Sequence, residues 1–453
     1  MRVQLVAVGP GNDGYAVRLP HALARQLGLS NMTMVKVKTG GRSLRARLLI
    51  TKGKTGKVIG LSRPLLTAIN MPRSISLRAR SDGDTLHLGP IVGILMPGAR
   101  GLPEPFGSLS LEVAYFIQQG RRAGVLPIAF TCSGIDFRRG TVRGYTLALS
   151  EEPYWVRRVL PLPDVVYDHI TVRRRDRSAE VRELRRQLSA ANIPYFNPGF
   201  FDKWEVHNWL SACPELAPHL PDTRCISGED LQKAAQKYRR LFIKPARGSL
   251  GRNITVLTRA NGESWSLRRG GRSPKKELIT DLNKVTDHLP PLAGDTYLVQ
   301  QGLELCRSRG RPVDVRVLMQ RSGNGKWGVT KIFARIPPSG QLVANITRGA
   351  KGRPVGIAMA RCFSRDKIPG IIRQIRQVAL QACICLDKEI NKPLGELGVD
   401  IGVDEDGHVW IIEVNAKPHR KAYDTLENRP GARRSFQRPM LYAAYLAGFG
   451  EGV

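Results

Sequence analysis

Two acidic residues and an asparagine near the carboxyl end of the chain have the types and spacing of a metal site. The run Gly398–Pro418 contains two β-rich apolar stretches around Asp406-Gly407, a pair that favours a two-residue hairpin turn. With that turn, Asp400 lies directly opposite Glu413, and Asn415 points to the same face. Opposed carboxylates repel each other, so the pattern predicts a cation between them. Hard oxygen ligands favour Mg²⁺, which leaves its other positions to water and nucleotide phosphates.

The alternative for this stretch is a surface hairpin with scattered acids. Asp400 and Glu413 each interrupt an otherwise apolar run, with Val399 and Ile401 on one strand and Ile412 and Val414 on the other. Such interruptions favour a site over a solvated surface.

A lysine and a glycine-rich loop upstream could bind phosphates. Lys244 ends a predicted strand, and Gly248, Ser249 and Gly251 follow it. Such a loop lets backbone N–H groups approach phosphate oxygens without interference from Cβ atoms. It is not a Walker A loop, because Gly-Lys-Ser/Thr is missing, and a plain hairpin loop is the alternative.

Further cations fall on predicted strands and at a helix start. The run Val-Asp-Val-Arg-Val-Leu alternates strictly, so Asp314 and Arg316 share one face while apolar residues cover the other. Arg335 adds a cation on a following strand. Arginines suit the oxygens of a triphosphate or an acyl phosphate. Lys203 lies in the first turn of a helix that Asp202 is expected to cap, and a merely exposed lysine is the alternative.

The elements that position these residues belong to three predicted segments, since 453 residues exceed one ordinary core. Residues 1–90 contain an internal repeat with a period of about 42, seen in the apolar pairs Leu19/Leu61 and Leu23/Leu65. Each copy reads as a strand, a short helix and further strands, which predicts a small interlocked, double-psi-like β-barrel. Residues 91–198 alternate strand and helix, which predicts an open α/β layer. Residues 199–453 carry the candidate chemistry.

Charge is the most unusual feature of the composition. The net charge is +33, and residues 1–90 hold 15 Lys and Arg against 3 Asp, a net +12. This predicts attraction to nucleic acid, an acidic polypeptide or an anionic surface, and an inert basic surface is the alternative. The aromatic content of 6% argues against a dedicated single-strand binder.

The cysteines and the lengths of the apolar runs indicate the cellular compartment in which the protein is expected. Seven cysteines without a Cys-x-x-Cys pair argue against a disulfide framework and a zinc site, so buried thiols are expected. No run of 18 apolar residues occurs, and the amino terminus lacks a signal-peptide layout. We therefore expect a cytoplasmic protein without a transmembrane segment.

The order of the motifs resembles the ATP-grasp superfamily over roughly residues 91–450. Several motifs resemble those of the endospore coat-associated YheC/YheD family. They are Phe-Asp-Lys-Trp, Lys-Pro-x-x-Gly-Ser-Leu-Gly, Val-Asp-x-Arg-Val-Leu and Gly-Glu-Leu-Gly-Val-Asp-Ile-Gly-Val-Asp. The resemblance implies a C-terminal ATP-grasp fold that binds ATP and Mg²⁺ between two α+β subdomains, preceded by a pre-ATP-grasp layer over residues 91–198.

The same resemblance implies roles for individual residues. The implied metal ligands are Asp400, Glu413 and Asn415. The implied ATP contacts are Lys203, Lys244, Gly248, Ser249, Gly251, the backbone of Gln301 and Leu303 for adenine, and Glu304 for ribose. The implied contacts to phosphate or to the acyl intermediate are Arg316, Arg335 and Arg348.

These features lead to an ATP- and Mg²⁺-dependent carboxylate–amine ligase as the predicted function, acting through an acyl phosphate. Its expected acceptor is a polyanion, and an acidic polypeptide of the spore coat is favoured over nucleic acid because such a ligase consumes carboxylates. The alternatives are an ATP-grasp kinase and a basic structural spore-coat protein with a vestigial nucleotide site. Intact Asp400, Glu413 and Asn415 speak against the structural protein.

Overall fold

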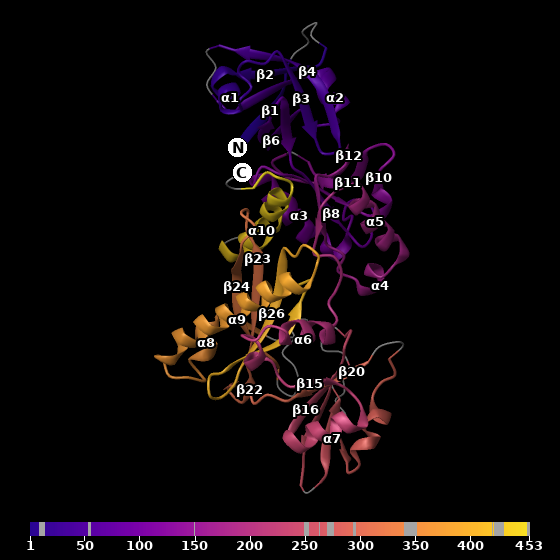
Figure 1. Cartoon of the computed structure of the whole chain (residues 1–453), viewed down its shortest axis with the longest axis vertical. Coiled ribbons are helices and arrows are strands. Elements are labelled where there is room, and N and C mark those ends of the chain that lie inside the picture. Colours follow the sequence, from indigo (N-terminus) through magenta and orange to yellow (C-terminus); the bar gives the residue numbers. More distant parts are fainter. Residues whose placement is uncertain are drawn as a thin grey trace. The chain divides into compact units, whose positions relative to one another are not determined.

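A computed structural model gives the fold of the chain (Figure 1). It describes residues 1–8, 14–52, 56–148, 150–248, 253–261, 263–269, 276–292, 296–338, 351–418, 420 and 430–450. The chain forms two compact units. Unit 1 contains Met1–Gly199, Arg321–Lys326 and Ala432–Val453, and unit 2 contains Phe200–Gln320 and Trp327–Gly431.

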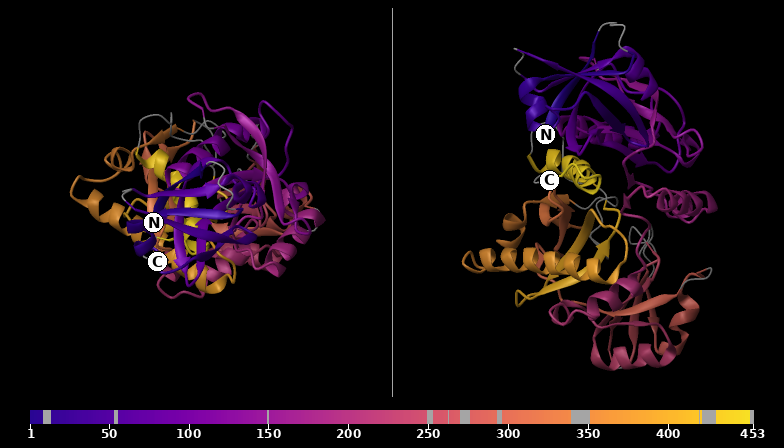
Figure 2. Two further views of the ribbon diagram at one scale, coloured as in Figure 1. Left: turned by 90° about the horizontal axis from the view of Figure 1, so that it is seen from above. Right: turned by 45° about the horizontal axis from the view of Figure 1, so that its top comes forward.

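The first part of unit 1 is a closed barrel of seven strands in the order β1-β5-β2-β4-β3-β7-β6, drawn in indigo in Figures 1 and 2. Its elements are β1 (Arg2–Val8), β2 (Ala16–Pro20), α1 (His21–Gln26), β3 (Met34–Thr39), β4 (Arg42–Thr51), β5 (Val58–Ser62), α2 (Arg63–Ala68), β6 (Ser74–Asp82) and β7 (Thr85–Gly89). Strand β1 pairs in parallel with β5, and β4 pairs in parallel with β2. Strand β2 of the first repeat copy also pairs with β5 of the second, and β3 of the first copy pairs with β7 of the second, which confirms the predicted interlocked barrel.

The second part of unit 1 is the predicted α/β layer. Its parallel strands β8 (Ile91–Leu95), β9 (Leu126–Phe130), β13 (Val165–Asp168) and β14 (Tyr195–Phe196) have the order β9-β8-β13-β14. Strands β10 (Ile135–Asp136), β11 (Thr141–Leu147) and β12 (Trp155–Pro161) extend the sheet in antiparallel fashion beyond β9. The helices are α3 (Ser110–Arg122), α4 (Arg173–Asp176), α5 (Ala179–Ala190) and α10 (Pro430–Leu446). All five residues of β8 are buried, as expected for a central parallel strand.

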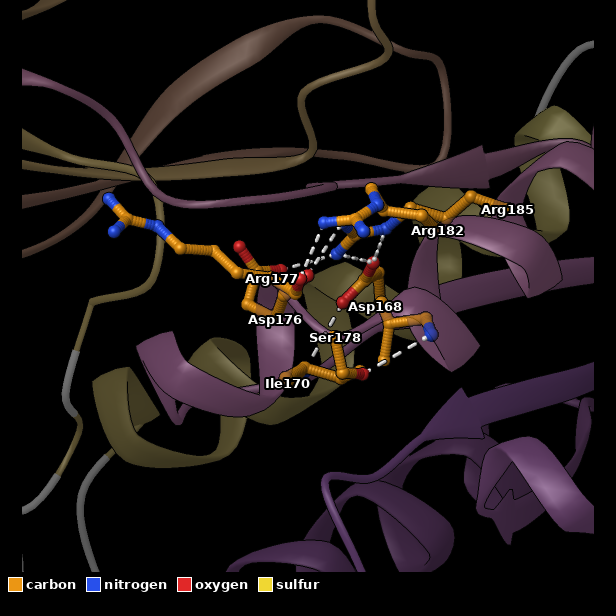
Figure 3. Close-up of polar contacts among 8 residues, drawn as sticks. Asp168, Ile170, Asp176, Arg177, Ser178, Arg182 and Arg185 are labelled. Atoms are coloured by element: carbon orange, nitrogen blue, oxygen red, sulfur yellow. Dashed lines mark hydrogen bonds and ion pairs between the residues drawn. The ribbon is translucent and has the colours of Figure 1, made fainter.

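An ion network closes the carboxyl end of β13 (Figure 3). The guanidinium of Arg185 on α5 donates to Asp168 at 2.6 and 2.9 Å and also pairs with Asp176 of α4. The Asp168 carboxylate accepts a further bond from the backbone N–H of Ile170 at 3.2 Å. Ser178 caps α5 by accepting from the N–H of Val181. The charges at this edge are therefore paired with one another, so we assign the network a structural role.

Unit 2 contains two larger sheets and the two-stranded antiparallel pair β21-β22. The first has the order β15-β20-β16-β17-β18-β19, and the second has the order β25-β24-β23-β26-β27. The strands are β15 (Thr223–Cys225), β16 (Arg240–Pro245), β17 (Thr255–Arg259), β18 (Trp265–Arg269), β19 (Lys276–Ile279), β20 (Tyr297–Gln301), β21 (Arg307–Ser308), β22 (Arg311–Pro312), β23 (Asp314–Arg321), β24 (Trp327–Ile336), β25 (Lys351–Arg353), β26 (Glu396–Val403) and β27 (Val409–Asn415). The helices are α6 (Lys203–Ser211), α7 (Gly228–Lys237), α8 (Val355–Met359) and α9 (Lys367–Glu389). Helix α9 packs against the second sheet (Figures 1 and 2).

One disulfide joins Cys213, just after α6, to Cys385 of α9. The expectation that the cysteines are all thiols is therefore wrong. The spacing of the cysteines could not have predicted this pair, because its partners are 172 residues apart in the sequence. The described residues also include the free cysteines Cys132, Cys225, Cys306, Cys362 and Cys383. No helix among the described residues is long and apolar enough to span a membrane.

Removal of this disulfide is expected to destabilise unit 2. Cross-linking restricts the unfolded chain, so Cys213→Ser should lower the free energy of unfolding by about 2–4 kcal/mol. Urea unfolding followed by tryptophan fluorescence measures the loss, and Cys225→Ser, which removes a half-buried free thiol, is the control. The prediction fails if the two variants unfold at the same urea concentration.

Candidate functional site

The hairpin of β26 and β27 places the two predicted metal carboxylates opposite each other. Asp400 pairs with Glu413 in the register of the two strands. The predicted two-residue turn is wrong, because the strands already end at the pair Val403 and Val409, and Gly407 takes a φ of 93° in the longer loop. A β-bulge after Asp400 offsets the register by one residue. The predicted pairing therefore occurs by a different local geometry.

Two arginines bracket the buried carboxylate of Asp400. Arg316 on β23 donates to it through Nε and through Nη2, the latter at 2.9 Å, and Arg335 on β24 reaches it at 3.0 Å. Arg335 also forms a bidentate pair with Asp314, at 2.5 and 2.8 Å. Burial opposes ionisation of Asp400, but the two guanidinium groups hold the pKa of this carboxyl below its usual value. Burial raises the pKa of Asp314 to about 6 against the pull of Arg335.

The two arginines predicted to face phosphate therefore contact acids in this structure. Arg348, the third predicted cation, lies outside the described residues. A group that hydrogen-bonds a metal-binding carboxylate fixes the orientation of that carboxylate. Arg316 and Arg335 are placed for that orienting role.

The donor set of the hairpin fits Mg²⁺. The Asn415 amide donates to the Asp400 carboxylate at 3.4 Å, so the two side chains adjoin. The Glu413 carboxylate lies 3.6 Å from the Lys203 ammonium and is the most accessible of the candidate carboxylates, with 29% of its side chain exposed against 8% for Asp400. No group of three or more His, Cys, Asp and Glu side chains in the described parts of the chain could hold a metal. A pair of carboxylates is the usual protein contribution to a Mg²⁺–nucleotide site.

A pocket lies beside these candidate ligands, with Glu413 in its lining. Its polar lining consists of Lys203 and His207 from α6, Lys244 from β16, Gln300 from β20 and Glu413 from β27. The remaining lining residues, mostly apolar, are Val206, Leu210, Leu220, Pro221, Thr223, Leu298, Ile411, Ile412 and Val414. A mostly apolar wall with a few convergent charges is typical of a small-molecule site.

Residues at the start of α6 form hydrogen bonds to the first part of the glycine-rich loop. The Lys203 backbone N–H donates to the Ala246 carbonyl at 2.9 Å, and its ammonium donates to the Gly248 carbonyl at 2.5 Å. Asp202 caps α6, as predicted, and also accepts from Arg247 at 3.0 Å. A Cβ on Gly248 would lie 2.9 Å from a Pro245 side-chain carbon, so the loop requires glycine there. Ser249 and Gly251 lie outside the described residues.

The predicted adenine and ribose contacts are mostly engaged within the protein. The Gln301 backbone N–H donates to the Asp222 carbonyl at 2.8 Å. The Glu304 carboxylate pairs with Arg240 at 3.1 Å. Leu303, which lies between Gln301 and Glu304 in the sequence, is half-buried. The nucleotide-binding roles of these three residues remain predictions.

Two pocket residues were missed by sequence reasoning. Gln300 accepts from the Lys244 ammonium at 2.8 Å and donates to Thr223 at 2.8 Å. His207 lies one helical turn after Lys203, and burial together with nearby Lys244 lowers its pKa. Period-two alternation along β20 and the i, i+4 spacing on α6 are the signals that could have identified them.

Lys244 is a buried lysine whose protonation state can change at mildly alkaline pH. It is 8% exposed, and burial lowers its pKa to about 8, with Glu413 opposing the shift and Lys203 adding to it. The phosphates of ATP favour the charged form, so they should raise this pKa on binding. ATP binding is then linked to protonation of Lys244.

ATP affinity is therefore expected to fall as the pH rises through about 8. The fall should reach up to about tenfold per pH unit, because free Lys244 is then neutral and must gain a proton on binding. Titrations of ATP between about pH 7.5 and about pH 9.5 measure it. Lys244→Arg keeps its charge over this range and should show a flatter profile, and parallel profiles for the two proteins would contradict the assignment.

Lys244→Ala should weaken ATP binding by roughly thirtyfold, about 2 kcal/mol, because one charge-assisted phosphate contact is lost. Adenosine has no phosphate, so its affinity should change little. Calorimetric titrations with both ligands provide the comparison, and Lys237→Ala, at an exposed lysine of α7, is the matched control. Equal losses for ATP and adenosine would place Lys244 away from the phosphates.

Comparison with known proteins identifies the family of the chain. The YheC/D-like ATP-grasp family model matches residues 192–446. The endospore coat-associated protein YheD of Bacillus subtilis (strain 168) is 30% identical over 412 residues, which cover 85% of this chain and 86% of that protein. The endospore coat-associated protein YheC of the same organism is 22% identical over 319 residues, 69% of this chain and 86% of its own.

Among solved structures, N5-carboxyaminoimidazole ribonucleotide synthetase from Thermotoga maritima aligns with 77% of this chain and 76% of its own, at 10% identity and a TM-score of 0.41. D-cycloserine synthetase DcsG aligns with 79% of this chain and 99% of its own, at 14% identity and a TM-score of 0.42. The family model spans more than half of the chain and contains the Asp400, Glu413 and Asn415 hairpin. The chain belongs to the YheC/D-like ATP-grasp family.

Proposed function

We propose that the protein is an ATP- and Mg²⁺-dependent carboxylate–amine ligase that acts through an acyl phosphate. The observation that carries the proposal is the pairing of Asp400 with Glu413 beside a pocket that contains Lys203 and Lys244. Opposed acids next to two lysines provide a place for a cation and for phosphate in one site. The family supports an ATP-grasp fold, and the choice of ligase chemistry is our inference.

In the proposed reaction, a substrate carboxylate oxygen attacks the γ-phosphorus of ATP and ADP leaves. An amine nitrogen then attacks the acyl carbon, and inorganic phosphate leaves as the amide forms. Lys203 and Lys244 hold phosphate oxygens in line, while Arg316 and Arg335 keep Asp400 ionised and oriented. Bound Mg²⁺, held by Asp400, Glu413 and Asn415, would offset charge on the phosphates. Such fixed electrostatics account for most of the rate gain in phosphoryl transfer.

We further propose that the carboxylate acceptor is an acidic polypeptide and that the protein acts in association with the spore coat. The names of the two Bacillus subtilis relatives place those proteins at the endospore coat. The net charge of +33 supports an anionic partner, and a ligase activates carboxylates, whereas phosphodiesters offer it nothing to activate.

Product analysis tests the ligase directly. The protein is incubated with ATP, Mg²⁺ and a panel of acids, with hydroxylamine as a small amine. A ligase yields ADP, phosphate and a hydroxamate from the preferred acid. ADP with a stable phosphate ester would instead identify a kinase, and no acid-dependent ADP across peptide and small-molecule acids would contradict enzymatic activity.

A further inference from the structure

One outward side of the barrel carries an array of cations on two paired strands. We call it the basic face and define it by Lys36 and Lys38 on β3 and by Arg45 and Arg47 on β4. All four side chains are exposed, while Val35 and Val37, which alternate with the lysines, are buried in the barrel. The alternation of the strands therefore directs two successive outward positions of each strand to the same side, and all four are cations.

The basic face brings like charges together. Lys36 lies directly opposite Arg45 across the β3–β4 pair, an arrangement that destabilises a sheet. On the other side of β3, His87 of β7 is in register with Lys38. Burial, together with the neighbouring cations Arg80 and Lys38, lowers the pKa of His87 to about 4. Burial is the main cause of this shift, and the two cations add to it.

The acids of the described barrel lie at one end of this face. They are Asp82 and Asp84, both exposed, at the turn between β6 and β7. Lys36 and Arg45 oppose each other at a cost to the sheet, and an external anion that contacts both side chains would offset that cost.

The spacing of the face suits an extended acidic peptide. Alternate residues on a strand are about 7 Å apart, and alternate side chains of an extended peptide repeat at the same distance. Carboxylates on one side of such a peptide can therefore meet Lys36 and Lys38, or Arg45 and Arg47, in succession. Residues 1–90 contain Tyr15 as their one aromatic residue, so a platform for stacking nucleic-acid bases is missing from the sequence of the barrel.

We propose that the basic face binds an extended acidic polypeptide and thereby recruits the polymer whose carboxylates the enzyme modifies. The choice of a polypeptide over other polyanions rests partly on the proposed ligase function. Each contact between exposed charges should be weak, and the affinity of the whole complex should fall strongly as the salt concentration rises.

The test measures binding of a fluorescent polyglutamate of about 20 residues to the full-length protein without ATP, at about 50 and about 300 mM salt, where the Debye length falls from roughly 14 to 6 Å. The face variant combines Lys36→Ser, Lys38→Ser and Arg45→Ser. The control variant removes the same charge from exposed positions on α1, on α2 and before β6, through Arg25→Ser, Arg63→Ser and Arg73→Ser. We expect the face variant to bind at least about tenfold more weakly and the control variant to lose less than about twofold.

The melting temperature separates binding from folding. Because the face variant loses an opposed pair of like charges, its melting temperature should equal or exceed that of the wild type. Equal losses of affinity in both variants would overturn the proposal, because the charge would then act diffusely. Tighter binding of single-stranded or duplex DNA of matched length and salt would overturn it in favour of nucleic acid.

The binding assay contains no ATP, so its outcome is independent of the ligase reaction. Polyglutamate binding at the basic face with no amide formed from any acid would contradict the proposed function alone. Amide formation from small acids with no polyglutamate binding would contradict the basic face alone.

Discussion

Replacing Arg335 by methionine is expected to lower the free energy of unfolding of unit 2 by about 3–5 kcal/mol. Arg335 is 7% exposed and bridges Asp314 and Asp400. Its removal leaves the mostly buried Asp314 without that cation, whereas Asp400 keeps Arg316. Losing one partner of a buried pair is costly because the remaining charge is neither hydrated nor compensated.

Urea unfolding followed by tryptophan fluorescence measures this loss, because Trp155 is the one tryptophan of the sequence that belongs to unit 1. The double variant Asp314→Asn with Arg335→Met removes the stranded acid and should regain part of the stability. Arg335→Lys keeps the positive charge but loses the planar guanidinium that binds carboxylates in bidentate fashion. Its free energy of unfolding should therefore lie between those of the wild type and Arg335→Met. A loss below about 1 kcal/mol for Arg335→Met would show that the network is not what stabilises this sheet.

Glu413→Gln is expected to weaken ATP binding at least about tenfold in the presence of Mg²⁺ and to leave binding without Mg²⁺ unchanged or stronger. Glu413 presents the most accessible of the candidate carboxylates, and its amide analogue keeps the shape but loses the charge that attracts the cation. Asp400 lies between two guanidinium groups, whereas the ion pair that the described residues give Glu413 is with the Lys203 ammonium. The substitution should therefore affect the metal with little effect on the fold.

Calorimetric titration of ATP with and without Mg²⁺ gives both affinities. Glu405→Gln, at an exposed acid in the loop of the same hairpin, removes an equal charge and serves as the control. If Glu413→Gln retains the Mg²⁺ dependence of the wild type, Glu413 is not a metal ligand. If the control loses as much, general charge rather than coordination is responsible.

Local patterns in the sequence predicted much of the architecture. The 42-residue repeat of the apolar positions predicted the interlocked barrel, because both copies must bury the same faces. The alternation in β23 predicted that Asp314 and Arg316 share a face, and Asp202 was predicted as the cap of α6. These properties depend on residues close in the chain, where period and capping chemistry act directly.

Features that depend on long-range packing could not be predicted. The disulfide of Cys213 and Cys385 forms because α6 packs against α9, and nothing in the spacing of the cysteines encodes that contact. The ion pairs of Arg335 require the register of neighbouring strands, which single-strand patterns leave open. The turn of the hairpin was predicted too short because a bulge after Asp400 changes the count of residues.

The transfer of oxygen from substrate to phosphate tests the central claim most directly. The protein is incubated with ATP, Mg²⁺, an amine and an acid substrate identified by the product assay, its carboxylate labelled with ¹⁸O, and the released phosphate is examined by mass spectrometry. An acyl-phosphate ligase breaks the bond between the acyl carbon and the bridging oxygen, so each amide formed should yield one phosphate with one ¹⁸O. Unlabelled phosphate accompanied by amide, or label retained in a stable phosphorylated product, would contradict the proposed ligase.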